Sequence, residues 1–352
     1  MPLALHRRSQ LRLDLIATAL AAFTTYAVAQ ESKPAVAPAA PAATKQIADE
    51  MIHITRLRDL DIIEPGGQRS FVSAASGLVR TGSYFHVVSD DELYLASFSV
   101  SDEKPGQLLR ILDGHLPEEA AARKKRKPDF EVLLSLPPDA KNPDGALLAL
   151  GSGSRLNRRR GVIITLAADG KALSSHTIDL APLFTPLDTR LKEVNIEGAV
   201  ILGNEFLLFQ RGNADTAVNA IVAYSLDATL KFLADPTVAL PAPDIRKVGL
   251  GAAKGVPLGF TDAAALPDGR IVFSAAAEAS SNAYDDGALA GAVIGLMDKT
   301  GIVLSKKSLS PMVKVEGIAA RLERNSIHLN LVTDADDPKV AASLYETNLG
   351  LK

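Results

Sequence analysis

Residues 196–213 read IEGAVILGNEFLLFQRGN. An acidic and a small residue, Glu197 and Gly198, open an apolar run, the pair Gly203-Asn204 interrupts it, and a second apolar run follows. Two apolar runs around such a pair are typical of a β-hairpin. The chain after residue 50 has the same texture throughout, and only residues 118–125 leave a helix and a charged loop equally open. The sequence therefore predicts an all-β fold.

The hairpin scheme recurs five times along the chain. Its opening residues, which we call the anchors, are separated by 55, 66, 64 and 55 residues. Repeats of this length, each with about four strands, are typical of β-propeller blades. We therefore expect a single propeller of five blades, with six blades as the alternative and a β-sandwich as the competing fold. The anchors are Ser76, Glu131, Glu197, Thr261 and Glu316.

The ring of blades needs a closing strand, because an unpaired edge strand promotes aggregation. The apolar alternation at residues 52–59 predicts such a strand. We expect it to join the last blade beside residues 341–348. The predicted propeller domain then spans residues 48–352.

The amino-terminal segment predicts export. Arg7 and Arg8 supply a positive start, residues 15–23 an apolar run, and Ala27-Val28-Ala29 a small-residue cleavage site. The apolar run is shorter than the roughly 20 residues that span a bilayer. Residues 1–29 therefore predict a signal peptide cleaved after Ala29 and a periplasmic or secreted protein. The paired arginines leave the twin-arginine and the general secretory routes both open.

Composition narrows the function classes. Residues 30–47 are rich in Ala and Pro, which predicts a flexible tether. The chain has no Cys, which excludes disulfides and a lipid-anchored cysteine. Its formal net charge of −3 gives no indication of nucleic-acid binding. No apolar run after the signal is long enough to cross a membrane.

The anchors predict a site on the propeller axis. The innermost strand of every blade lines the central channel, so equivalent residues converge there. Three carboxylates and two hydroxyls would meet, and buried carboxylates repel unless a cation lies between them. Oxygen ligands without Cys or His select a hard cation, and Ca²⁺ tolerates such a ring better than Mg²⁺. The alternative is that the glutamates only brace neighbouring blades.

A second tier of polar residues follows one strand later. Candidate general bases there are Asp90, Glu278 and Asp334. The Gly-rich loop at residues 151–154 offers N–H groups to an anion, although a plain turn has the same composition. Guanidinium groups beside a carboxylate and metal centre suit phosphate-like substrates. The candidate substrate-binding residues are Ser152, Ser154, Arg155, Arg211 and Asn213.

The chain resembles an uncharacterised family of exported bacterial propellers of the phytase-like type, a resemblance that implies the fold and no known reaction. It covers residues 71–348 through SGL, KPDFE, GSGS, NIEGA, QRGN, FTDAAALPDG, FSAAAE, KVEGIA and LVTDADD. More distantly, the anchor order is similar to the Ser, Glu, Glu, Ser, Glu calcium ring of the calcium-activated nucleotidases (apyrases). Asp90-Asp91 resembles the start of that family's Asp-Asp-Arg-Thr-Gly segment, but Glu92 and Leu93 replace its Arg and Thr.

Two functions remain open from the sequence. The first is a Ca²⁺-dependent hydrolase of phosphorylated small molecules, with lactone or ester hydrolysis as a weaker variant. The second is a non-catalytic propeller that binds a ligand or protein in the cell envelope around a structural cation. A small anionic molecule is the expected ligand of the first. The sequence leaves open whether the protein is an enzyme at all.

Overall fold

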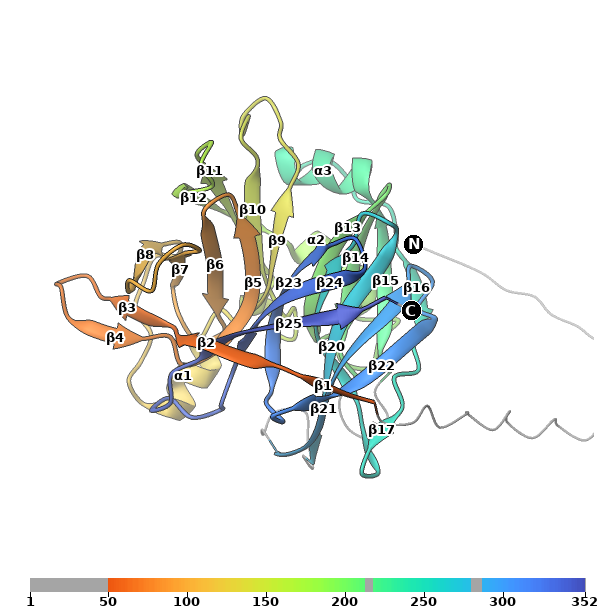
Figure 1. Cartoon of the computed structure of the whole chain (residues 1–352). Coiled ribbons are helices and arrows are strands. Elements are labelled where there is room, and N and C mark those ends of the chain that lie inside the picture. The colour runs from red at the N-terminus through yellow and green to blue at the C-terminus, as the bar shows by residue number, and fades with distance from the viewer. Residues whose placement is uncertain (1–49, 213–217, 280–286, 352) are drawn as a thin grey trace, which may run out of the picture. The chain divides into compact units, whose positions relative to one another are not determined.

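The computed structural model describes residues 50–212, 218–279 and 287–351 (Figure 1). Residues 47–352 form one compact unit. The predicted signal peptide and tether lie outside the described residues. Within the described part, no helix is long and apolar enough to span a bilayer.

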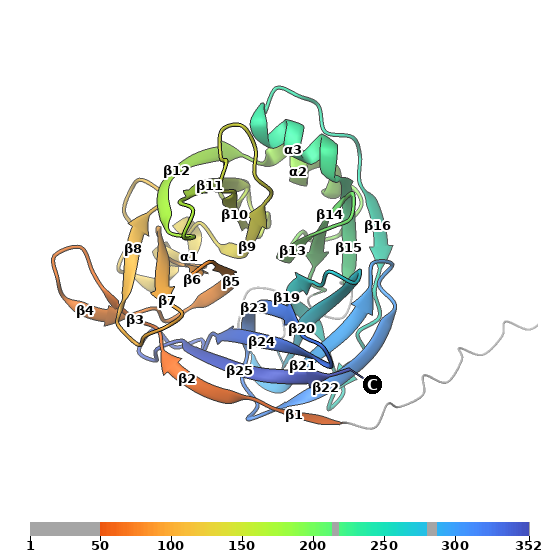
Figure 2. The same cartoon turned by 45° about the horizontal axis from the view of Figure 1, so that its top comes forward.

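Five four-stranded blades surround a central axis, so the five-bladed propeller is confirmed (Figure 2). The innermost strands are β5 (Ala75–Thr81), β9 (Phe130–Leu136), β13 (Ile196–Leu202), β19 (Gly259–Ala265) and β23 (Val315–Leu322). The second strands are β6 (Tyr84–Ser89), β10 (Ala146–Gly151), β14 (Glu205–Gln210), β20 (Arg270–Ala279) and β24 (Ser326–Thr333). The third strands are β7 (Tyr94–Ser99), β11 (Arg160–Leu166), β15 (Ala220–Ser225), β21 (Ala288–Asp298) and β25 (Ser343–Gly350). The outermost strands are β8 (Gly106–Arg110), β12 (Ala172–Asp179), β16 (Asp244–Lys247), β22 (Val303–Ser310) and β2 (Thr55–Asp59).

The predicted closing strand is confirmed and serves two blades. β2 lies antiparallel to β25 of the fifth blade, with Thr55 opposite Glu346. β1 (Met51–His53) lies parallel to β22 of the fourth blade. The segment that the sequence treats as one strand therefore joins two neighbouring blades to each other.

The first blade carries two additional strands that the sequence does not predict. β3 (Asp61–Ile63) lies parallel to β8, and β4 (Arg69–Phe71) pairs antiparallel with β3. They form a hairpin at the blade's outer edge (Figure 1).

Short helices connect some of the strands. The segment 118–125, where the sequence leaves helix and loop open, forms α1 (Ala120–Arg126), which the Glu119 carboxylate caps at two backbone N–H groups. The remaining helices and a small hairpin are not predicted. They are η1 (Leu156–Arg158), α2 (Ala181–Phe184), η2 (Thr185–Leu187), α3 (Leu226–Ala234), β17 (Ala252–Ala253) and β18 (Val256–Pro257).

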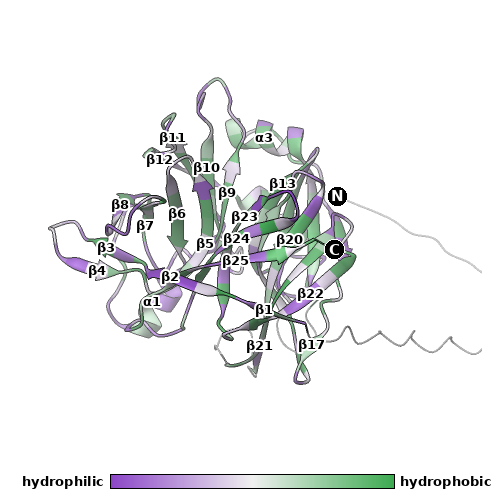
Figure 3. Cartoon of the chain, viewed as in Figure 1, coloured by the Kyte–Doolittle hydropathy of each residue, from purple (hydrophilic) through white to green (hydrophobic). Residues whose placement is uncertain are grey.

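The hydrophobic core consists of five clusters, one in each seam between neighbouring blades. Successive strand residues point to opposite faces. Val87 accordingly belongs to the seam with the fifth blade, and Val88 to the seam with the second. In Figure 3 the hydrophobic colouring follows the strands, while α1 and β4 are largely hydrophilic. The period-two pattern thus buries both faces of each blade.

Glycines directly after three anchors let the innermost strands approach one another. A Cβ on Gly317 would lie 2.8 Å from the backbone nitrogen of Leu78 in the first blade. A Cβ on Gly77 would lie 2.9 Å from the nitrogen of Leu133, and one on Gly198 3.0 Å from that of Ala263. Contacts this short require the neighbouring backbone to move.

We expect Gly317→Ala to lower the free energy of unfolding by about 1–3 kcal/mol, because overpacking displaces β5. The matched control is Gly350→Ala, which has no atom within 4 Å of its added Cβ. Urea denaturation of the two variants and the wild type measures the difference. Equal stabilities for the two variants would contradict the close approach of β23 and β5.

Candidate functional site

Every anchor is the extra residue of a β-bulge. In the fifth blade, Val315 pairs with Thr333 and Gly317 with Val332, so Glu316 has no partner between them. The same register shift isolates Ser76, Glu197 and Thr261 in their innermost strands. In the second blade it isolates Glu131. A bulge redirects a side chain away from the regular alternation, and bulges are common beside active sites.

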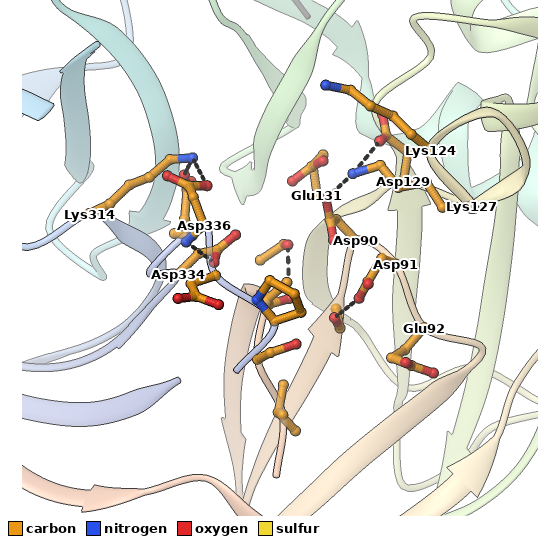
Figure 4. Close-up of a pocket in the computed structure, with 18 of the residues that line it drawn as sticks. Asp90, Asp91, Glu92, Lys124, Lys127, Asp129, Glu131, Lys314, Asp334 and Asp336 are labelled. Carbon is orange, nitrogen blue, oxygen red and sulfur yellow. Dashed lines mark hydrogen bonds and ion pairs between the residues drawn. The ribbon is translucent and has the colours of Figure 1, made fainter. Parts of the chain in front are cut away.

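The axial end of the innermost strands opens into a cavity of about 1340 Å³ (Figure 4). Four anchors line it, namely Ser76, Glu131, Glu197 and Glu316. Thr261 does not line it. Its hydroxyl donates to the carbonyl of Val315, with 2.5 Å between the oxygens, and so joins the fourth blade to the fifth.

One side of the cavity carries three carboxylates that come close together. One oxygen each of Asp90, Asp129 and Glu131 lies within 4.8 Å of the others. The ammonium of Lys127 forms ion pairs with Asp90 and, at 3.2 Å, with Asp129. Arg158 lies 2.8 Å from Asp129. Glu131 makes no hydrogen bond or ion pair with any described residue.

The protonation of these groups follows their environment. Burial raises the pKa of Asp90 to about 6, although Lys127 acts in the opposite direction. Burial, followed by the charge of Glu197, raises the pKa of Glu131 well above its usual range. A bound cation would therefore stabilise the ionised form of Glu131.

Two basic side chains neutralise part of the opposite side. The Lys314 ammonium lies 3.0 Å from a Glu278 oxygen and 3.1 Å from a Glu316 oxygen. It also lies 3.0 Å from an oxygen of Asp336 (Figure 4). Arg211 forms an ion pair with Glu278 and lies 3.5 Å from a Glu197 oxygen.

Three acids on this side respond differently to their surroundings. Burial opposes ionisation of Glu278, but Arg211 and Lys314 outweigh it and lower the pKa of that carboxyl. Burial raises the pKa of Glu316 well above its usual range, and its Oε2 has no hydrogen-bond partner among the described residues. Burial also raises the pKa of Asp334 to about 7.

The structure brings eight of the thirteen predicted site residues to this one cavity. They are Ser76, Asp90, Glu131, Glu197, Arg211, Glu278, Glu316 and Asp334. Thr261, Ser152, Ser154 and Arg155 do not line it, and Asn213 lies outside the described residues.

The serines of the Gly-rich loop lie behind Asp129. The buried Ser152 hydroxyl donates to the Asp129 carboxylate, and the Ser154 oxygen lies 2.8 Å from that of Ser152. Arg158 donates to Ser154 at 2.9 Å. The loop therefore fixes the orientation of Asp129.

Sequence reasoning misses Asp129 and Lys314, although a common position holds them. Both lie two residues before an anchor, as do Ala74, Asn195 and Gly259, and all five line the cavity. The side chains differ so much that the position does not look like a repeat. Gly259 leaves room for a cavity side chain, because a Cβ at this position would lie 2.8 Å from Cγ of Arg211. A comparison of the five blades at the position two residues before each anchor would have identified these cavity residues.

Fold and cavity together define a five-bladed propeller with a densely charged axial pocket. The chain belongs to a family of unknown function (DUF6929), whose model matches residues 71–349. No curated protein matches it. The predicted likeness to exported phytase-like propellers and to apyrases stays a prediction.

Solved structures share the fold at low identity. Glutaminyl cyclase of Myxococcus xanthus has 11% identity and a TM-score of 0.42, over 85% of this chain and 100% of that one. A putative glycoside hydrolase of Parabacteroides distasonis has 12% identity and a TM-score of 0.46, over 86% and 98%. An exo-1,5-α-L-arabinanase from a bovine ruminal metagenomic library has 7% identity and a TM-score of 0.39, over 79% and 94%. Function must be argued from the site.

Proposed function

We propose that the protein binds a divalent cation, preferably Ca²⁺, at Asp90, Asp129 and Glu131. We further propose that it hydrolyses a phosphorylated small molecule at this site. The carrying observation is the approach of the three carboxylates to within 4.8 Å, with Glu131 unpartnered among the described residues. Carboxylate oxygens without thiolate or imidazole suit a hard cation, and Ca²⁺ accepts irregular geometry. The predicted export would place this activity outside the cytoplasm.

The donor set fits a cation better here than at the five anchors. Glu197 and Glu316 face Arg211 and Lys314, which already supply positive charge. Thr261 uses its hydroxyl on a backbone carbonyl. Lys127 partly neutralises Asp90 and Asp129. A cation bound to the three carboxylates is therefore expected to lie near Glu131, which has no such ion pair with any described residue.

The chain's own residues can support phosphoryl chemistry. The cation, when bound, would polarise a phosphoryl oxygen. Lys127 and Arg158 are held beside the group by Asp129 and can stabilise negative charge on the phosphate. Asp334, whose pKa of about 7 suits proton transfer near neutral pH, is the preferred general base. Arg211 is engaged by two carboxylates and is proposed as a fixed phosphate contact.

A non-catalytic binding function is the second candidate. Arg211 and Lys314 connect the third, fourth and fifth blades through carboxylates around the axis. Such a network stabilises the ring without any turnover. Under this alternative a cation stabilises the protein and no substrate is hydrolysed.

We expect Ca²⁺ to raise the melting temperature of chelator-treated protein, because a ligand that binds only the folded state stabilises it. Glu131→Gln should weaken Ca²⁺ binding at least about tenfold, since it removes one charged ligand. Glu103→Gln, at an exposed position outside the cavity, is the matched control. Isothermal titration with CaCl₂ gives the affinities, and phosphate release from a panel of phosphoesters tests turnover. Absence of Ca²⁺ binding in the wild type refutes the proposed site, and binding without turnover favours the second candidate.

A further inference from the structure

The axial cavity extends into the seam between the first and fifth blades. Its lining includes residues from every strand of the first blade, from the innermost strand to the added hairpin: Ser76 on β5, Val87 on β6, Ala96 on β7, Leu108 on β8 and Ile62 on β3. The opposite wall includes the segment 336–338, which follows β24 of the fifth blade. The cavity therefore runs from the axis to the outer edge of the blade.

Polarity changes along this path. The axial end carries the carboxylates and the basic groups described above. The apolar part of the outer wall consists of Val87, Ala96 and Leu108 together with Ile62 and Phe71 of the β3–β4 hairpin, and polar side chains of the same blade, Glu64, Ser70, Ser73 and Tyr94, line the cavity beside it. Val87, Ala96 and Ile62 belong to the hydrophobic cluster of this seam, and Leu108 packs against it. Among the described residues, the first blade alone carries such a hairpin, and the hairpin extends the apolar wall.

We propose that the cavity binds an elongated amphiphile, with its charged head group at the axis and an unbranched hydrocarbon chain against the apolar wall. A cavity of about 1340 Å³ is much larger than a phosphate needs. The apolar side chains from three neighbouring strands and the hairpin give a hydrocarbon chain a surface to pack against. The phosphate nature of the head group rests on the proposed function, whereas the place of the chain rests only on the apolar wall.

The test is a chain-length series of ethyl, butyl, hexyl and octyl phosphate, titrated below the concentrations at which they aggregate. Each series is measured with CaCl₂ and again with chelator. We expect the affinity to rise about fourfold for each added methylene, which corresponds to about 0.8 kcal/mol per buried CH₂. The rise should appear under both conditions if the wall binds the chain.

Two neighbouring leucines supply a matched pair of variants. Leu108 lines the cavity, whereas Leu109 on the same strand packs against the seam with the second blade. Leu108→Ala should weaken octyl phosphate binding about tenfold and leave ethyl phosphate unchanged, and Leu109→Ala should change neither. Phe71→Ser offers a second variant at the wall should Leu108→Ala fold poorly.

The outcomes separate the two proposals. Equal affinities across the series, or no binding of octyl phosphate under either condition, overturn the amphiphile proposal. A chain-length rise in which every affinity is the same with CaCl₂ and with chelator supports the apolar site and refutes the metal-dependent function. The same rise with every affinity higher in CaCl₂ supports both proposals. If the phosphates bind only with Ca²⁺ and the affinity does not rise with chain length, the metal-dependent function is supported and the amphiphile proposal is refuted.

Discussion

Replacing Lys314 by Met is expected to lower the free energy of unfolding by about 3–5 kcal/mol near pH 7.5, because it leaves buried carboxylates without their counter-charge. The ammonium lies within 3.1 Å of oxygens of Glu278, Glu316 and Asp336, and only 10% of its side chain is exposed. Met keeps most of the side-chain volume, so the loss reports charge and not a cavity.

Urea denaturation at pH 7.5 and pH 5 measures this effect. The loss should shrink at pH 5, because burial raises the pKa of Glu316 and a lower pH favours the protonated form, which needs no counter-charge. Lys231→Met, which breaks a surface pair with 64% of the lysine side chain exposed, is the control and should cost less than about 1 kcal/mol. Equal losses in the two variants would show that the network around Lys314 contributes nothing beyond a surface pair.

Asp334→Asn is expected to stabilise the chelator-treated protein at pH 8 by about 1–3 kcal/mol, with the gain absent at pH 4. Burial raises the pKa of Asp334 to about 7 in the folded protein, above the value of about 4 for an unfolded Asp. The folded state therefore favours the protonated form. Stability from this group is fully present below about pH 4 and is lost as the pH rises towards 7. Asn imitates the protonated acid and can still accept the hydrogen bond from the Asp336 N–H, which the Asp carboxylate accepts at 2.7 Å.

The measurement is the free energy of unfolding of both proteins from pH 4 to pH 8. The full pKa difference of about three units corresponds to about 4 kcal/mol. Asp334 is partly exposed, and solvent screening reduces what is realised. Asp113→Asn, at an exposed position outside the cavity, is the control and should change little at any pH. A variant that is less stable than the wild type at pH 8 would contradict the raised pKa. If Asp334 is also the general base, phosphoester turnover should be lost in the same variant.

The fold and the anchors could be predicted because they depend on regular features of the sequence. Apolar alternation buries both faces of every blade, and the repeat places one polar residue at each bulge. The β3–β4 hairpin could not be predicted in the same way, since EPGGQ at residues 64–68 interrupts its two short runs and resembles a loop.

The candidate site was predictable only in part, for two physical reasons. Thr261 shares the anchor position, but its hydroxyl donates a hydrogen bond to a nearby backbone carbonyl. The buried glutamates instead need a positive charge from another residue or a bound cation. The partners Asp129 and Lys314 share a position without sharing chemistry, so no repeat of residue type reveals them. The Gly-rich loop that contains Ser152 resembles an anion-binding loop in sequence, yet the Ser152 hydroxyl donates its hydrogen bond to Asp129.

The closing strand has a consequence for the order in which the protein can fold. β2 precedes every blade in the chain, but its partner β25 is the last strand. A chain that emerges amino end first therefore holds β2 without a partner until nearly all of the polypeptide is available. The ring can become complete only in a late step, and an interrupted chain is left with an open, unpaired edge.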